Sequence, residues 1–222
     1  MIYCYDEIDG SFDTKIDKIN TIVIENRNLF RAVVQDIYNR IDGLSGKSVL
    51  GTGDGKLLDF SKYAEIFTSF VPFEINRKGL ITKITSAVEK ESLSGYRYES
   101  TMKILTDIER YMEGLTSSFD CNLAFSKITA GALIKAVGIE IVDDYTSLGE
   151  KIIDYMELVR EFDKEKIFFT VNFRSFVDDE ETEEFMKTVK IHDFHLVMFE
   201  NKEYNILEHE LRRTIDEDLC EF

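Results

Sequence analysis

The chain lacks the residues and segments that mark secreted and membrane-spanning proteins. Its 222 residues include one proline and three cysteines, Cys4, Cys121 and Cys220, which are scattered and show no CxxC spacing. This cysteine usage fits a reducing compartment and no disulfide framework. No basic and apolar leader opens the sequence, and no apolar run approaches the roughly 20 residues that a membrane-spanning helix needs. We therefore expect a cytoplasmic protein with no membrane contact.

Motifs for covalent and zinc-dependent hydrolysis are also absent. The sequence contains no GxSxG, no HExxH and no Cys/His pair. His192 and His195 have a spacing that zinc ligands can adopt, but no second ligand pair follows at a zinc spacing. These absences point away from catalysis, and we expect a non-enzymatic protein.

Positive charge is scarce. The chain has 27 Lys and Arg against 43 Asp and Glu, which gives a net charge of −16. Such a charge favours solubility and repels nucleic acid and anionic membranes at long range. Because the sequence has no long basic run, a DNA-binding surface would need folding or assembly to gather its basic residues.

The sequence does contain an alternation of apolar strands and amphipathic helices. A strand is predicted at 21–24 and a helix from about residue 28. Further helices are predicted at 129–137, 147–162 and 179–190, and further strands at 139–142, 167–171, 195–199 and 214–220. Strands that are apolar on both faces and separated by helices favour a mainly parallel sheet covered on both sides. The expected fold class is α/β.

One segment interrupts this alternation. Residues 76–119 predict two helices, of which Asn76 caps the first and Ser94 and Gly95 form the turn between them. We interpret them as an antiparallel helix pair, a helical leg inserted into an α/β head. The head then comprises residues 1–75 and 120–222.

Two glycine-rich stretches imitate a phosphate-binding loop. Lys47 follows Gly46 as in that motif, but Ile41 stands where the first glycine belongs, and stretch 51–56 has the wrong spacing. Glu200 follows an apolar strand, like the acid that positions magnesium in nucleotide hydrolases. A glycine-rich turn and a strand ending in a surface carboxylate account for these residues more simply. A divergent nucleotide hydrolase that uses Lys47 and Glu200 stays open as an alternative, and so does an acidic protein-interaction scaffold without DNA affinity.

The order of elements and several stretches resemble a known family. The stretches are residues 128–139 (ITAGALIKAVGI), residues 166–172 followed by an acidic helix, residues 197–200 and residues 215–218, together with residues 21–38. They are similar to the accessory spacer-acquisition (adaptation) protein of type II-A CRISPR–Cas systems, the ring-forming, DNA-end-binding Csn family. The resemblance covers most of the chain from about residue 20.

This resemblance implies a homotetrameric ring whose basic channel encircles double-stranded DNA without sequence preference and loads at free ends. The function it implies is assistance to CRISPR spacer acquisition in antiviral defence, with the CRISPR integrase proteins and the effector nuclease as partners. It also implies a head similar to a degenerate P-loop ATPase, and we expect no bound nucleotide. A basic channel with acidic outer faces would reconcile the net charge with DNA binding.

The candidate DNA-binding residues lie in the helical leg or shortly after it. Arg77, Lys78 and Lys83 stand at the start of the first predicted helix, and Lys127 and Lys135 follow the leg. Lysine and arginine contacts to phosphates position a protein on DNA without reading its sequence. Lys135, in the stretch Leu-Ile-Lys-x-x-Gly, aligns best with the family.

The resemblance also raises the question of calcium. Family members often carry an acidic, calcium-binding cluster between leg and head, whereas residues 118–125 of this chain keep only Asp120. Asp120 is therefore the candidate metal ligand, and calcium is the candidate cofactor.

Overall fold

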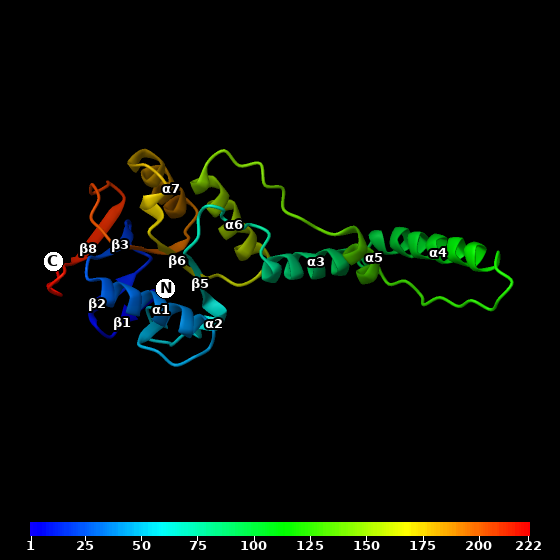
Figure 1. The fold of residues 1–222 in the computed structure, drawn as a ribbon, viewed down its shortest axis with the longest axis horizontal. Helices are drawn as coiled ribbons and strands as arrows, with labels where there is room; N and C mark the ends of the chain where they lie inside the picture. The colour runs from blue at the N-terminus through cyan, green and yellow to red at the C-terminus, as the bar shows by residue number, and fades with distance from the viewer. The chain divides into compact units, whose positions relative to one another are not determined.

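A computed structural model describes residues 1–222, which form two compact units (Figure 1). Unit 1 comprises residues 1–75 and 144–222, and unit 2 comprises residues 76–143. Unit 1 combines helices with a parallel sheet, so the predicted α/β class is confirmed.

The parallel sheet of unit 1 has five strands in the order β5-β6-β7-β3-β8. The strands are β5 (Ala64–Phe67), β6 (Ile167–Val171), β7 (His195–Glu200), β3 (Ile19–Ile24) and β8 (Glu210–Ile215). Every residue of β3, β6 and β7 is buried. This is the pattern of inner strands in a parallel sheet that is covered on both faces, as the sequence predicts.

One face of this sheet is covered by α1 (Arg27–Ile41), α2 (Phe60–Tyr63) and a three-stranded antiparallel sheet of order β2-β1-β4. The strands of this small sheet are β1 (Ile2–Tyr5), β2 (Ile8–Asp13) and β4 (Ser48–Gly51). Tyr3 of β1 is fully buried, with its ring centroid 5.0 Å from that of Phe169 and 6.0 Å from that of Phe199. β1 and β2 have no counterpart among the predicted strands, because they are short and mix buried with exposed positions.

The opposite face carries α6 (Leu148–Phe162) and α7 (Asp179–Ile191), as Figure 1 shows. A 3₁₀ turn, η1 (Phe173–Ser175), leads from β6 to α7. Each helix starts at a side-chain cap: the N–H of Glu150 donates to Ser147 Oγ (3.4 Å), and that of Glu181 donates to Asp178 Oδ1 (2.9 Å). These caps explain why the predicted starts at 147 and 179 agree with the observed ones.

The closing strand differs from the prediction. It was expected at 214–220, whereas β8 ends at Ile215. Beyond this residue the chain turns through Leu219, which has a φ of 66°, and the Phe222 N–H returns to the Thr214 carbonyl at 3.0 Å. The apolar residues at the end of the sequence therefore belong to a turn and not to a longer strand.

Unit 2 extends beyond the predicted leg, which ended at residue 119. The reason is α5 (Ala130–Val137), which packs against α3 (Lys78–Ser92). At the buried Gly131 of α5, the backbone lies close to the flexible carboxylate end of Glu89 on α3. Residues 120–143 therefore fold with the leg and not with the head.

A side chain also replaces one predicted strand. Asn76 donates from Nδ2 to the carbonyl of Ile141 (3.0 Å) and accepts the Ile141 N–H at Oδ1 (2.7 Å). Residues 139–142 were predicted as a strand, but they pair with no strand. The side chain of Asn76 thus makes backbone hydrogen bonds that a neighbouring strand would otherwise make.

The two long helices of unit 2 do not form the expected antiparallel pair. Figure 1 shows α4 (Arg97–Thr116) extending away from the end of α3. The turn between them keeps near-helical dihedrals at Leu93 (φ −99°, ψ 6°) and Tyr96 (φ −69°, ψ −16°), and only Gly95 has a positive φ, of 45°. Such a turn shifts the chain without reversing it. Neither α4 nor any other helix of the chain is long and apolar enough to cross a membrane.

Candidate functional site

The net charge is distributed unevenly between the two units. Residues 76–143 contain nine Lys and Arg and nine Asp and Glu, so unit 2 is neutral. Unit 1 therefore carries the whole net charge of −16. Long-range repulsion of phosphates comes from unit 1, and basic side chains face less competing negative charge in unit 2.

All five candidate DNA-binding residues lie in unit 2. Lys78, Lys127 and Lys135 are exposed and take part in no ion pair, whereas Arg97 pairs with Glu91 and Arg110 pairs with Asp107. Lys83 is exposed and Arg77 is half-buried. The five residues come from three segments: the start of α3, the chain before α5, and the last turn of α5.

The start of α3 concentrates positive potential. The helix has no side-chain cap and no acidic residue in its first turn, so neither a cap nor an acidic side chain of that turn offsets the positive end of its dipole. Arg77 and Lys78 stand at this end. Helix N-termini of this kind bind phosphate oxygens.

Two lysines of unit 2, Lys90 and Lys103, are exposed but were not among the candidates from the sequence. Lys90 follows Lys83 by seven residues, about two turns, so both lie on one side of α3, and both are exposed. Lys103 is exposed on α4. Lys90 could have been predicted from its helical spacing to Lys83.

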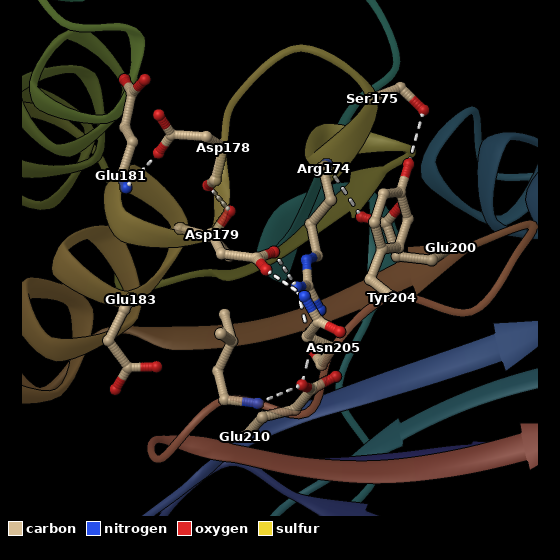
Figure 2. Close-up of polar contacts among 12 residues, drawn as sticks. Arg174, Ser175, Asp178, Asp179, Glu181, Glu183, Glu200, Tyr204, Asn205 and Glu210 are labelled. Atoms are coloured by element: carbon tan, nitrogen blue, oxygen red, sulfur yellow. Dashed lines mark hydrogen bonds and ion pairs between the residues drawn. The ribbon is translucent and has the colours of Figure 1, made fainter.

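Unit 1 contains a network of buried charges between its sheet and the start of α7 (Figure 2). Arg174 lies at its centre and is 3% exposed. Its Nη2 donates to Asp179 Oδ1 (2.6 Å) and to the Asn205 carbonyl (3.0 Å), and its Nη1 donates to Glu210 Oε2 (3.5 Å). Arg212 donates to both oxygens of Glu210, at 3.0 and 2.9 Å. The guanidinium groups of Arg174 and Arg212 thus share the buried carboxylate of Glu210. Each of these three charged groups has a partner of opposite charge.

Glu200 adjoins this network at the end of β7 and is fully buried. Its Oε1 accepts the backbone N–H of Arg174 at 3.2 Å, and its Oε2 has no hydrogen-bond partner. Burial raises the pKa of Glu200 to about 7, although the N–H and the charge of Arg174 act in the opposite direction. The carboxyl group therefore titrates near neutral pH.

The residues of the nucleotide-hydrolase alternative lie on different sheets. Lys47 immediately precedes β4 of the antiparallel sheet, where it pairs with Glu7, and Glu200 ends a strand of the parallel sheet. A phosphate loop has to lie between a strand and a helix so that the helix N-terminus meets the phosphates. Lys47 follows α1 and does not precede it, so it cannot take the role of the phosphate-loop lysine.

The place between β3 and α1, where a phosphate loop would lie, is occupied differently. Asn26 accepts the N–H groups of Asn28 (3.1 Å) and Leu29 (3.0 Å) at Oδ1, so its side chain takes the donors that a phosphate would use. A cavity of about 480 Å³ beside this helix start is lined by the carboxylates of Glu7 and Glu221. Two carboxylates repel a phosphate, and the geometry therefore disfavours nucleotide binding here.

A comparison with protein families followed from this architecture of an α/β unit with a helical insertion. A family model described as CRISPR-associated protein (Cas_Csn2) matches residues 41–219. The chain belongs to this family. The resemblance found in the sequence is thereby confirmed, and the protein has a CRISPR-associated role.

The match to the Cas_Csn2 family spans all of unit 2 and most of unit 1. Within unit 1 it includes the buried network around Arg174 and the strands β4 to β8. The strands β1, β2 and β3 precede the matched range.

Asp120, the candidate calcium ligand in this Cas_Csn2 protein, is exposed in the turn after α4 and belongs to no group of three possible ligand residues. The group with that geometry is Glu183, Glu208 and His209 in unit 1, whose ligand atoms lie within 4.8 Å of one another. Hydrogen bonds explain this group, because the Glu183 carboxylate accepts the N–H groups of Glu208 (3.1 Å) and His209 (3.2 Å). Calcium binding through Asp120 stays a prediction.

Proposed function

We propose that this Cas_Csn2-family protein binds double-stranded DNA without sequence preference through unit 2. In this proposal it acts as a homotetrameric ring that loads at DNA ends and assists spacer acquisition, together with the CRISPR integrase proteins and the effector nuclease. It works in the cytoplasm and performs no bond chemistry. The observation that carries the proposal is the charge partition: unit 2 is neutral although the chain as a whole has a net charge of −16.

The basic residues of unit 2 support phosphate contacts. Lys78, Lys127 and Lys135 are exposed and are not engaged in ion pairs. Contacts between lysine and phosphate release condensed counterions from the DNA, so their free energy depends on salt and not on base sequence. This is the type of binding that a ring sliding from a DNA end would use.

The apolar face of α4 supports assembly. Ile104, Tyr111 and Leu115 lie on one side of the helix at spacings of seven and four residues, and they are 51%, 66% and 42% exposed. A contiguous exposed apolar surface of this kind marks an interaction site. A second copy of the chain is the occupant that the proposal assigns to it.

The decisive experiment is a mobility-shift comparison of linear and covalently closed circular DNA of one sequence, with calcium and with chelator. A ring threaded over ends retards only the linear form. Equal binding to both forms would contradict end loading and indicate an open groove. Binding to neither form would favour the acidic scaffold. The chelator lanes test the calcium prediction separately.

Variants locate the DNA contact. The triple variant Arg77→Ala/Lys78→Ala/Lys83→Ala and the single variant Lys135→Ala should weaken DNA binding, and each lost phosphate contact should lower the slope of log affinity against log salt by about one. Size-exclusion chromatography should show an unchanged oligomer.

The matched control is Lys15→Ala/Lys18→Ala/Lys56→Ala, which removes three exposed lysines from unit 1. It should leave the salt slope unchanged. Equal weakening by the control and the unit 2 variants would mean that only the total charge matters, and the proposed contact surface would then be wrong.

A further inference from the structure

The buried network of unit 1 balances its charges only when Glu200 is protonated. Arg174 and Arg212 supply two positive charges, and Glu210 and Asp179 supply two negative charges. An ionised Glu200, fully buried at the end of β7, adds a third carboxylate without adding a cation. A buried charge without a partner is costly, so this carboxylate has to share a cation that already has other partners.

The titratable groups around Glu200 come from η1, β8, α7 and the loop after β7. The strands on either side of β7, which are β6 and β3, contain no titratable residue. Arg174 of η1 attracts the Glu200 carboxylate, and Glu210 of β8 repels it. The other titratable groups around the network are Asp179 and Glu183 of α7, Arg212 of β8, and Glu203, Tyr204 and His209 of residues 201–209.

Arg174 and Glu200 each have one buried polar atom that makes no hydrogen bond within the protein. These atoms are Arg174 Nε, a donor, and Glu200 Oε2, an acceptor when the carboxyl group is ionised. The two residues are already joined, because the Arg174 backbone N–H donates to Glu200 Oε1 at 3.2 Å (Figure 2). A bond from Arg174 Nε to the ionised carboxylate would satisfy both atoms at once.

Each acceptor that Arg174 now serves has a second donor. Arg212 donates to both oxygens of Glu210. Arg212 Nη2 also donates to the Asn205 carbonyl at 3.0 Å, and Asn205 Nδ2 donates to Asp179 Oδ2 at 2.7 Å. The Asp179 side chain is 42% exposed, so water can solvate its carboxylate. Arg174 can therefore move without leaving a buried carboxylate unpaired.

We propose that Glu200 and Arg174 form a proton-controlled switch at the start of α7. When Glu200 is protonated, Arg174 pairs with Asp179 and holds the first turn of α7 to η1. When Glu200 loses its proton to solvent, Arg174 turns its Nε to the Glu200 carboxylate and releases Asp179. The first turn of α7 and residues 201–209 are then less firmly attached to η1.

Both states of this switch are populated near neutral pH. Burial raises the pKa of Glu200 to about 7, so the protonated form predominates below this pH and the ionised form above it. All residues of the switch belong to unit 1, so the proposal is independent of DNA binding by unit 2.

Pulsed hydrogen exchange of the full chain tests the release of α7. The parent is compared at one pH with Glu200→Gln, which stays neutral, so the intrinsic pH dependence of exchange cancels. Pulses short enough to leave α1 unexchanged in both proteins restrict the readout to local opening. The first turns of α7 and residues 201–209 should exchange equally in the two proteins at pH 5.5, and at least about fivefold faster in the parent at pH 8.5. Equal exchange at pH 8.5, or a difference already present at pH 5.5, would overturn the proposal.

The titration midpoint of Glu200 gives a second readout. Difference infrared spectroscopy follows the carbonyl band of the protonated carboxyl group, which is identified by its loss in Glu200→Gln. Asp179→Asn frees Arg174 for Glu200 and should lower the midpoint by at least about half a pH unit. The matched control Glu180→Gln removes an exposed carboxylate from the same turn and should shift the midpoint much less. An unchanged midpoint in Asp179→Asn, or equal shifts in both variants, would contradict the exchange of partners.

Discussion

The two units of the chain differ in how much apolar surface they bury. In unit 1, large side chains such as Tyr3, Phe169 and Phe199 are buried against a covered face of the parallel sheet. In unit 2, the 20-residue α4 buries only Leu105. Helices of this length depend on packing of an apolar face for much of their stability in water. The difference indicates that unit 1 is complete as a folded core, whereas α4 needs a further surface to pack against.

The units also differ in their net charge and in the burial of their charged side chains. Unit 1 carries all the net negative charge, yet it also buries Arg174 and Glu210 in its interior. Unit 2 is neutral, and its five candidate phosphate contacts are exposed or half-buried. If the comparison is right, substitutions in unit 1 change stability most, and substitutions on the surface of unit 2 change assembly and DNA binding with little change in stability.

The largest effect is expected from Arg174→Met. The variant leaves Glu210 with one guanidinium instead of two and leaves the Asp179 carboxylate without its charged partner. Breaking a buried ion pair by removing one partner costs about 3–5 kcal/mol in the free energy of unfolding. Urea denaturation at pH 7 measures it.

The control for Arg174→Met is Lys47→Met, which breaks the solvent-exposed pair with Glu7 in the same unit. Exposed pairs contribute little, so this variant should unfold almost as the parent does. Similar losses in the two variants would show that burial of the network is not what stabilises unit 1.

A smaller and pH-dependent effect is expected from Glu200→Gln. The folded-state pKa of Glu200 is raised to about 7 from an ordinary value of 4.5, so ionisation opposes folding. The variant should match the parent below pH 4.5, gain stability progressively between pH 4.5 and 7, and keep a gain of up to about 3 kcal/mol above pH 7. The Gln side-chain oxygen can still accept the Arg174 N–H. Urea denaturation across this pH range checks the curve, and a gain independent of pH would contradict it.

Replacing either of two glycines of unit 2 by alanine should change the stability of this unit by about 1 kcal/mol, in opposite directions. Gly138 ends α5 with a φ of 82°, and Gly79 lies in the first turn of α3; a Cβ would meet open space at both. Gly138→Ala should lower the stability of unit 2, because alanine disfavours positive φ. Gly79→Ala should raise it by up to about 1 kcal/mol through helix propensity. Hydrogen exchange of α3 and α5 measures both, and changes of the same sign would contradict the conformational argument.

The parts of the fold that could be predicted from the sequence are those with strong local signals. The strands β3, β6 and β7 are apolar at nearly every position, and the helices after Ser147 and Asp178 begin at side-chain caps. Both signals lie within a few residues of the element that they define. Strands β1 and β2 of the small antiparallel sheet offer neither signal, since they are short and irregular in burial.

The buried network could not be predicted, because its partners are distant in sequence. Arg174 and Glu210 are 36 residues apart and meet only once β8 has paired with β3. A charged residue such as Glu210 is expected to be exposed from the sequence alone. The closing strand was therefore predicted to begin at residue 214, four residues after the observed start of β8. The candidate DNA residues have the same limitation: their positions in unit 2 depend on α5 packing against α3, a contact between segments that are distant in sequence.

The smallest effect on stability, and a large effect on assembly, is expected from Ile104→Glu/Tyr111→Glu on α4. Both side chains are more than half exposed, so their replacement removes little buried surface and should change the free energy of unfolding by no more than about 0.5 kcal/mol. If α4 packs against a second copy, two charges on this face shift the oligomer toward monomer, which analytical ultracentrifugation measures. Thr106→Glu, on an exposed position outside this apolar row, is the matched control and should keep the oligomer. An intact oligomer in the double variant would place the assembly surface elsewhere, and the exposed face of α4 would then have to be explained by a different partner.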